Sequence, residues 1–166
     1  MSRNTRFGIL VMLLSLLSVS IDAQKELYTS YINQYMDMAV EQMARYRIPA
    51  SITLAQALLE SRAGTSPLAV SGKNHFGIKC GSSWSGPYML VDDDAKDEHF
   101  RVYQSVKDSY EDHSRFLRVN GRYANLFSLK MTDYKGWAYG LKAAGYATNP
   151  KYADILIQLI EDYDLS

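Results

Sequence analysis

The chain has 166 residues, of which 47% are hydrophobic, and this composition supports one folded domain with a substantial core. Equal numbers of basic and acidic residues, 18 of each, give a net charge of zero and exclude the clearly basic surface that nucleic-acid binding requires. The single cysteine, Cys80, excludes an internal disulfide, and the three histidines lack ligand spacing, which argues against a metal site.

The first 23 residues have the order typical of a secretory signal peptide. Two arginines precede an apolar run at residues 7–19, and the small residue Ala23 follows. The run is shorter than the roughly 20 apolar residues of a comfortable membrane span. We therefore expect residues 1–23 to be removed and residues 24–166 to form the domain, in the periplasm or outside the cell. An uncleaved N-terminal anchor is the alternative.

Hydrophobic residues at helical spacing predict a first helix over residues 28–47 and a second over residues 50–63. Pro49 suits the start of the second helix, and Gly64 suits a stop behind it. Residues 65–87 show no periodicity and are expected to be irregular.

Two short strands, at residues 88–91 and 99–103, flank an acidic connection and predict a β-hairpin. Ser105 and Asp108 fit a capping box that begins a helix reaching about residue 118. Three helical segments follow, at residues 122–127, at 133–144 behind a Thr132 cap, and from Asn149 and Pro150 to residue 163. The chain is therefore expected to be mainly α, with one small β lobe.

Glu60 is the carboxyl that best suits acid catalysis. Cleavage of a glycosidic bond needs a carboxylic acid that stays protonated near neutral pH, and partial burial against apolar neighbours raises a carboxyl pKa. Glu60 follows the apolar stretch at residues 54–59, in the last turn of its predicted helix, where the helix carbonyls also disfavour a negative charge. Taken alone, Glu60 fits an ordinary surface acid better than a catalytic one, and the motifs around it reverse this preference.

Five motifs surround and follow Glu60. They are AQALLESRAG at residues 55–64, NHFGIK at 74–79, SWSGP at 83–87, FRVY at 100–103 and AGYATNPKYA at 144–153. In this order they resemble the glucosaminidase family of peptidoglycan hydrolases, glycoside hydrolase family 73, which includes autolysins and the flagellar-rod hydrolases. The resemblance covers roughly residues 30–163.

The resemblance implies a lysozyme-like α+β fold, in which a helical lobe and a small β-hairpin lobe line a glycan cleft. It implies an endo-β-N-acetylglucosaminidase that hydrolyses the bond between N-acetylglucosamine and N-acetylmuramic acid in peptidoglycan. No cofactor is implied, because an acid, a base and water suffice. Glu60 matches the family's general acid. Tyr146 matches its cleft tyrosine, although simple packing also explains a tyrosine there.

The partners expected on this basis are the glycan strands of peptidoglycan. No nucleic acid, and no membrane after signal cleavage, is expected to bind, and the domain is expected to be a monomer. Two rival functions stay open. One is a lytic transglycosylase on the same fold, and the other is a catalytically inactive glycan-binding module of the envelope.

The hairpin departs from the family pattern, in which many members carry a second catalytic Glu. Counting forward from Pro87 without gaps places Ala95 at that position. We expect Asp94 or Asp93 to act as the base or to stabilise the oxocarbenium-like transition state, and a solvated turn is the alternative. A substrate-assisted route through the acetamido group of the sugar would need no nucleophilic side chain.

Further residues of the motifs are candidates for sugar binding, because amides suit acetamido groups and aromatic rings suit sugar faces. They are Asn74, Phe76, Trp84, Asn149 and Tyr152. Phe76 and Trp84 fit core packing as well. His113 lies on the apolar side of its predicted helix and is expected to be a core residue.

Overall fold

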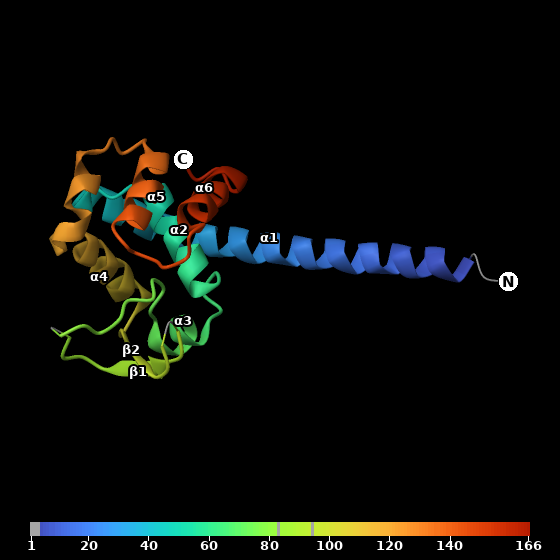
Figure 1. The fold of residues 1–166 in the computed structure, drawn as a ribbon, viewed down its shortest axis with the longest axis horizontal. Coiled ribbons are helices and arrows are strands. Elements are labelled where there is room, and N and C mark those ends of the chain that lie inside the picture. Colours follow the sequence, from blue (N-terminus) through green and yellow to red (C-terminus); the bar gives the residue numbers. More distant parts are fainter. Residues whose placement is uncertain (1–3, 83, 94) are drawn as a thin grey trace.

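The computed structural model describes residues 4–166 apart from Ser83 and Asp94, with side chains from Asp22 onward. Helices make up most of this part, and a two-stranded sheet lies to one side of them (Figure 1). The elements are α1 (Asn4–Tyr46), α2 (Ala50–Ser61), α3 (Pro67–Gly72), β1 (Tyr88–Val91), β2 (Glu98–Arg101), α4 (Val106–Val119), the 3-10 helix η1 (Gly121–Ser128), α5 (Tyr134–Ala143) and α6 (Tyr152–Asp162). The expected mainly α chain with a small β lobe is confirmed.

Helix α2 lies at the centre of the fold and is buried along most of its length. Helices α1, α5 and α6 all contact it. It supplies Ile52 to a core cluster around Trp137, and Leu58 to a second cluster around Tyr110. Because α2 is packed on several sides, the position of its last turn, which carries Glu60, is fixed by the core.

The end of α2 comes two residues earlier than expected. Arg62, rather than Gly64, terminates the helix by adopting the left-handed conformation, with φ of 52°. The backbone N–H of Ala63 then donates to the Leu58 carbonyl at 2.9 Å, which caps the last turn. Glu60 stays in that last turn, where it was expected.

The predicted first helix is the C-terminal part of α1, which runs without a break from Asn4 to Tyr46. In Figure 1 the N-terminal part of this helix projects away from the other elements. Among the described residues, no helix has both the length and the apolar character needed to cross a membrane.

The β lobe consists of the hairpin and the segments packed on it. Strands β1 and β2 are antiparallel, with Tyr88 opposite Arg101 and Val91 opposite Glu98. Strand β2 begins one residue earlier and ends two residues earlier than expected. Lys79 forms an isolated bridge with Phe100, which joins the NHFGIK motif to the edge of the sheet.

Two local predictions fail, and a third is confirmed. Helix α3 lies in a segment that was expected to be irregular. It was not predicted because six residues are too few to show helical periodicity. The cap of α5 is Asp133, which accepts from the Gly136 N–H at 2.9 Å, and not Thr132. The capping box of Ser105 and Asp108 at the start of α4 is present as expected.

Candidate active site

Glu60 lies partly buried at the end of α2, close to side chains from α6 and from the hairpin turn. The hydroxyl of Tyr152 donates a hydrogen bond to Glu60 Oε1 at 3.0 Å. The pKa of Glu60 is raised to about 7: burial is the largest cause, the Tyr152 hydrogen bond opposes it, and the negative charge of Asp93 adds to it. Near neutral pH the carboxyl is therefore available in its protonated form, as a general acid requires.

Tyr152 is one of the predicted sugar ligands, and the structure corrects its place. Its side chain is 2% exposed, so the ring lies behind Glu60 and has no surface to offer a sugar. Its hydroxyl oxygen accepts a hydrogen bond from Gln56 Nε2 at 3.0 Å, and Gln56 Oε1 lies 3.2 Å from His113 Nε2. Tyr152 thus links Glu60 to a buried polar chain.

His113 is a core residue, as expected, and stacks on Phe76 with ring centroids 3.9 Å apart. Complete burial lowers the pKa of His113 to about 3, so the imidazole is neutral at the pH of any cell compartment. Its Nδ1 atom has no hydrogen-bond partner within the described part of the chain.

Tyr146 lies beside the acid. Its ring stacks on that of Tyr152, with centroids 5.7 Å apart, and its hydroxyl donates to the Phe76 carbonyl at 3.2 Å. Burial, and after it the negative charges of its neighbours, including Glu60, raise the pKa of Tyr146 well above its usual value. Tyr146 therefore stays neutral, and its ring lies close to the Glu60 carboxyl.

Asn74 and Phe76 are also predicted sugar ligands, and both are buried. The Asn74 amide nitrogen donates to the carbonyls of Ile78 and Arg101, and its oxygen accepts from the N–H groups of Phe76 and Ile78. All four hydrogen-bonding positions of this amide are occupied. Asn74 therefore shapes the motif loop, and Phe76 packs under it; neither offers a free polar atom or an exposed face to a sugar.

A charged cluster joins the hairpin to the NHFGIK motif. Lys79 Nζ lies 3.1 Å from an Asp93 carboxylate oxygen and 2.8 Å from both carboxylate oxygens of Glu98. Asp93, one of the two predicted second acids, is the carboxylate that acts on the pKa of Glu60. Asp94, the other, lies outside the described residues.

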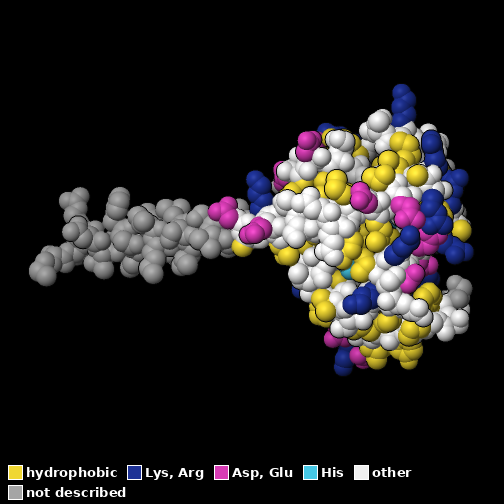
Figure 2. All heavy atoms as spheres, turned by 180° about the vertical axis from the view of Figure 1, so that it is seen from behind, with side chains coloured by type: hydrophobic (Ala, Val, Ile, Leu, Met, Phe, Trp, Pro, Cys, Tyr) yellow, Lys and Arg dark blue, Asp and Glu magenta, His cyan; other side chains and the backbone are white. Residues whose placement is uncertain are grey.

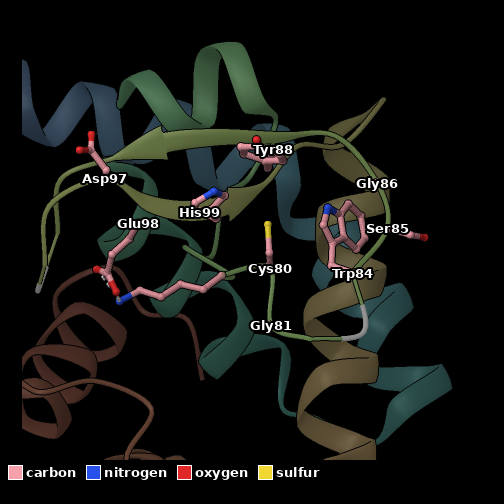
Figure 3. A pocket seen from close by; sticks show the side chains of 10 residues that line it. Cys80, Gly81, Trp84, Ser85, Gly86, Tyr88, Asp97, Glu98 and His99 are labelled. Atoms are coloured by element: carbon pink, nitrogen blue, oxygen red, sulfur yellow. Dashed lines mark hydrogen bonds and ion pairs between the residues drawn. The ribbon is translucent and has the colours of Figure 1, made fainter.

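A pocket with a volume of about 730 Å³ opens next to this cluster. Lys79 is among its lining residues. Figure 3 shows Glu98 at one end of the pocket and the rings of Trp84, Tyr88 and His99 along the rest. Glu60 does not line it. The Trp84 indole N–H donates to the Pro87 carbonyl at 3.0 Å, and the Arg101 guanidinium lies 4.9 Å from the ring centroid. Trp84 is thus held in one orientation at the pocket wall.

The remaining predicted sugar ligand, Asn149, is exposed in the loop before α6, and its side-chain oxygen Oδ1 accepts from the Lys151 N–H at 2.9 Å. Among the described side chains, no three His, Cys, Asp or Glu residues are grouped to hold a metal ion. Basic and acidic side chains are interspersed on the face seen in Figure 2.

Sequence reasoning missed four residues of the site: Gln56, Lys79, Glu98 and the polar role of His113. A signal existed for Gln56, because it precedes Glu60 by four residues on the same helix and so shares its face. Glu98 was missed because its contact with Lys79 joins residues 19 positions apart, which no local pattern indicates.

The chain is similar to proteins of known family. Residues 36–165 match the family model Glucosaminidase, described as mannosyl-glycoprotein endo-beta-N-acetylglucosaminidase. The exo-glucosaminidase LytG of Bacillus subtilis is 35% identical over 133 residues, which is 73% of this chain and 46% of LytG. The peptidoglycan hydrolase FlgJ of Vibrio parahaemolyticus is 32% identical over 141 residues, which is 78% of this chain and 46% of FlgJ. The chain thus spans about half the length of these curated relatives.

Among solved structures, a peptidoglycan hydrolase from Sphingomonas sp. A1 superimposes with a TM-score of 0.73 at 30% identity, over 82% of this chain and 89% of that one. The glycoside hydrolase domain of FlgJ from Salmonella typhimurium gives a TM-score of 0.66 at 29% identity, over 82% and 88% of the two chains. The lysozyme-like fold is therefore confirmed, and the chain belongs to the glucosaminidase family, glycoside hydrolase family 73.

Proposed function

We propose that this chain is an exported endo-β-N-acetylglucosaminidase that hydrolyses the bond between N-acetylglucosamine and N-acetylmuramic acid in peptidoglycan. One observation carries the proposal: a partly buried carboxyl, Glu60, has its pKa raised to about 7 beside a second carboxylate, Asp93. Two carboxyl groups of unlike environment are the arrangement that glycoside hydrolysis needs. Relatives named as peptidoglycan hydrolases support the choice of substrate.

In the proposed reaction Glu60 gives its proton to the glycosidic oxygen as the bond from that oxygen to the anomeric carbon breaks. The leaving sugar departs with a free hydroxyl, and positive charge develops on the remaining ring. Asp93 or Asp94 stabilises this charge or removes a proton from the attacking water. Tyr146, which is neutral and next to Glu60, contributes a wall of the site and holds the Phe76 loop through its hydroxyl.

The pocket beside the charged cluster is proposed to bind sugar rings of the strand that extend away from the cleaved bond. Trp84 has a partly exposed ring in a fixed orientation, which suits stacking against a sugar face. Asn149 is exposed in the loop before α6 and is proposed to bind a sugar hydroxyl or acetamido group.

Export is proposed from the N-terminal segment alone, with the domain at residues 24–166 acting as a monomer in the periplasm or outside the cell. Mass spectrometry of the exported protein should then find Gln24 as its first residue. An intact N-terminus at Met1 would instead support the anchored alternative.

Digestion of purified sacculi tests the proposed activity. Wild-type protein should release fragments that end in a reducing N-acetylglucosamine, and Glu60→Gln should lower the rate by at least about a hundredfold because the proton donor is lost. Mass spectrometry of the fragments separates the alternatives. Anhydro-muramyl ends would show a lytic transglycosylase, and intact sacculi with bound wild-type protein would show a binding module.

A further inference from the structure

The buried hydrogen bonds behind Glu60 run in one donor-to-acceptor order, from His113 through Gln56 and Tyr152. This order determines which of the two carboxyl oxygens of Glu60 carries the proton. We propose that Gln56 and His113 are positioning residues, which orient the Tyr152 hydroxyl so that the transferable proton of Glu60 resides on Oε2. This inference rests on the proposed role of Glu60 as the proton donor.

The order of donors and acceptors is set by the tautomer of His113. A neutral imidazole carries one proton, either on Nδ1 or on Nε2. Nε2 lies 3.2 Å from an amide oxygen, Gln56 Oε1, whereas Nδ1 has no partner among the described residues. A proton on Nε2 gives this buried N–H an acceptor, and a proton on Nδ1 would leave a buried donor unpaired. His113 is therefore the Nε2–H tautomer.

The orientation of the Gln56 amide determines which hydrogen bond Tyr152 makes. Because Gln56 Oε1 accepts from His113, its Nε2 atom is the group that faces Tyr152 and donates to the hydroxyl oxygen, at 3.0 Å. With that lone pair engaged as an acceptor, the Tyr152 hydroxyl has its own proton left to give. Its other neighbour is Glu60 Oε1, at 3.0 Å, so the hydroxyl donates to that oxygen.

The hydrogen bond from Tyr152 determines which oxygen of the Glu60 carboxyl is protonated. Oε1 is held as an acceptor, so the proton of the neutral acid is placed on Oε2. A Cβ placed on Gly77 would lie 3.7 Å from Oε2, so this oxygen faces the loop that leads to Lys79 and the hairpin. Glycine at position 77 places no side chain against Oε2 on this side.

Several groups face Glu60, and two of them, Tyr152 and Asp93, shift its pKa. Tyr152 and Tyr146 approach it from the C-terminal segment, and Asp93, which is paired with Lys79, approaches it from the hairpin turn. Loss of Gln56 frees the Tyr152 oxygen to accept a hydrogen bond from a proton on Oε1. The neutral acid would then hold its proton on the wrong oxygen, and the pKa of Glu60 would rise.

The first test is the tautomer of His113 in the wild-type chain, read from ¹⁵N–¹H correlations of its imidazole between pH 5 and 8. The expected pattern is a neutral ring protonated on Nε2 throughout. A ring protonated on Nδ1 overturns the inference, because Gln56 would then present its oxygen to Tyr152 and the hydroxyl would have an acceptor other than Glu60.

The second test compares Gln56→Met with Gln42→Met. Gln42→Met is a matched control that replaces, in the same way, a buried amide on α1 with no hydrogen-bond partner among the described residues. Gln56→Met should lower kcat on sacculi about tenfold, leave KM within about twofold, and move the alkaline limb of the pH profile upward by several tenths of a pH unit. Gln42→Met should change none of these. Equal behaviour of the two variants overturns the inference.

Glu60→Gln separates this inference from the proposed function. If Glu60→Gln keeps wild-type activity, the proposed function fails, whatever the tautomer of His113. If Glu60→Gln is inactive while Gln56→Met matches Gln42→Met, the proton donor stands and only the positioning role is lost. If Gln56→Met does not fold, the tautomer of the wild-type chain still decides.

Discussion

Three effects act on the pKa of Glu60 in opposite directions, and the largest of them decides the outcome. The hydrogen bond from Tyr152 favours the ionised form, while burial and the charge of Asp93 favour the neutral form. Burial is the largest of the three, so the pKa ends at about 7 instead of below its usual value. The same residue with a more exposed side chain would be an ordinary carboxylate with no proton to give at neutral pH.

The raised pKa predicts a stability penalty with a definite sign. Between about pH 4.5 and pH 7 the folded chain binds a proton at Glu60 that the unfolded chain has lost, so stability falls as pH rises through this window. Glu60→Gln removes the penalty. Its free energy of unfolding, relative to wild type, should therefore be higher at pH 8 than at pH 4.5, by up to about 3 kcal/mol.

Urea unfolding of both proteins at the two pH values measures this difference. Glu161 is the matched control, because Lys135 and Tyr134 lower its pKa. Glu161→Gln should show no gain at pH 8. A Glu60→Gln difference that does not change with pH would contradict the raised pKa.

At the scale of elements, one lysine links the NHFGIK motif to the turn of the hairpin and to the start of β2. Lys79 belongs to the NHFGIK motif and contacts Asp93 in the turn and Glu98 at the start of β2. Both contacts are partly exposed, so they contribute little to stability. Their effect lies instead in where they hold the Asp93 carboxylate relative to Glu60.

Lys79→Met should therefore reduce activity more than stability. We expect kcat/KM on sacculi to fall about tenfold, because the second carboxylate loses its position, while the free energy of unfolding changes by less than about 1 kcal/mol. Lys107→Met is the matched control, since Lys107 pairs with Glu41 at 3.2 Å on the helical lobe. If both variants keep full activity, the proposed role of the charged cluster is wrong.

Helix ends that are specified by residues close together in the sequence were predicted correctly. Helix ends that depend on backbone geometry, and helices too short for a periodic pattern, were not. Ser105 and Asp108 specify the start of α4 through contacts only three residues apart, so the sequence is sufficient. At α5, two neighbouring residues both suit a cap, and only the backbone geometry selects Asp133 over Thr132. The six-residue α3 has no periodic pattern to read.

At the scale of the whole molecule, the site depends on contacts between distant parts of the chain. Tyr152 is 92 residues from Glu60 and 96 from Gln56, and His113 is 57 from Gln56. Position on a helix and family resemblance were sufficient to single out Glu60 and Tyr146. They were insufficient to show that Tyr152 and Asn74 face inward, because burial is decided by how α2, α6 and the β lobe pack together.

The pH dependence of hydrolysis tests the central claim, that Glu60 is a proton donor with a raised pKa. Initial rates of sugar release from purified sacculi, measured from pH 4 to pH 9 with Glu60→Gln as the blank, give kcat/KM as a function of pH. We expect an alkaline limb with its midpoint near pH 7, where Glu60 loses its proton. A rate that stays constant up to pH 9, or a Glu60→Gln variant with the same profile as wild type, would contradict it.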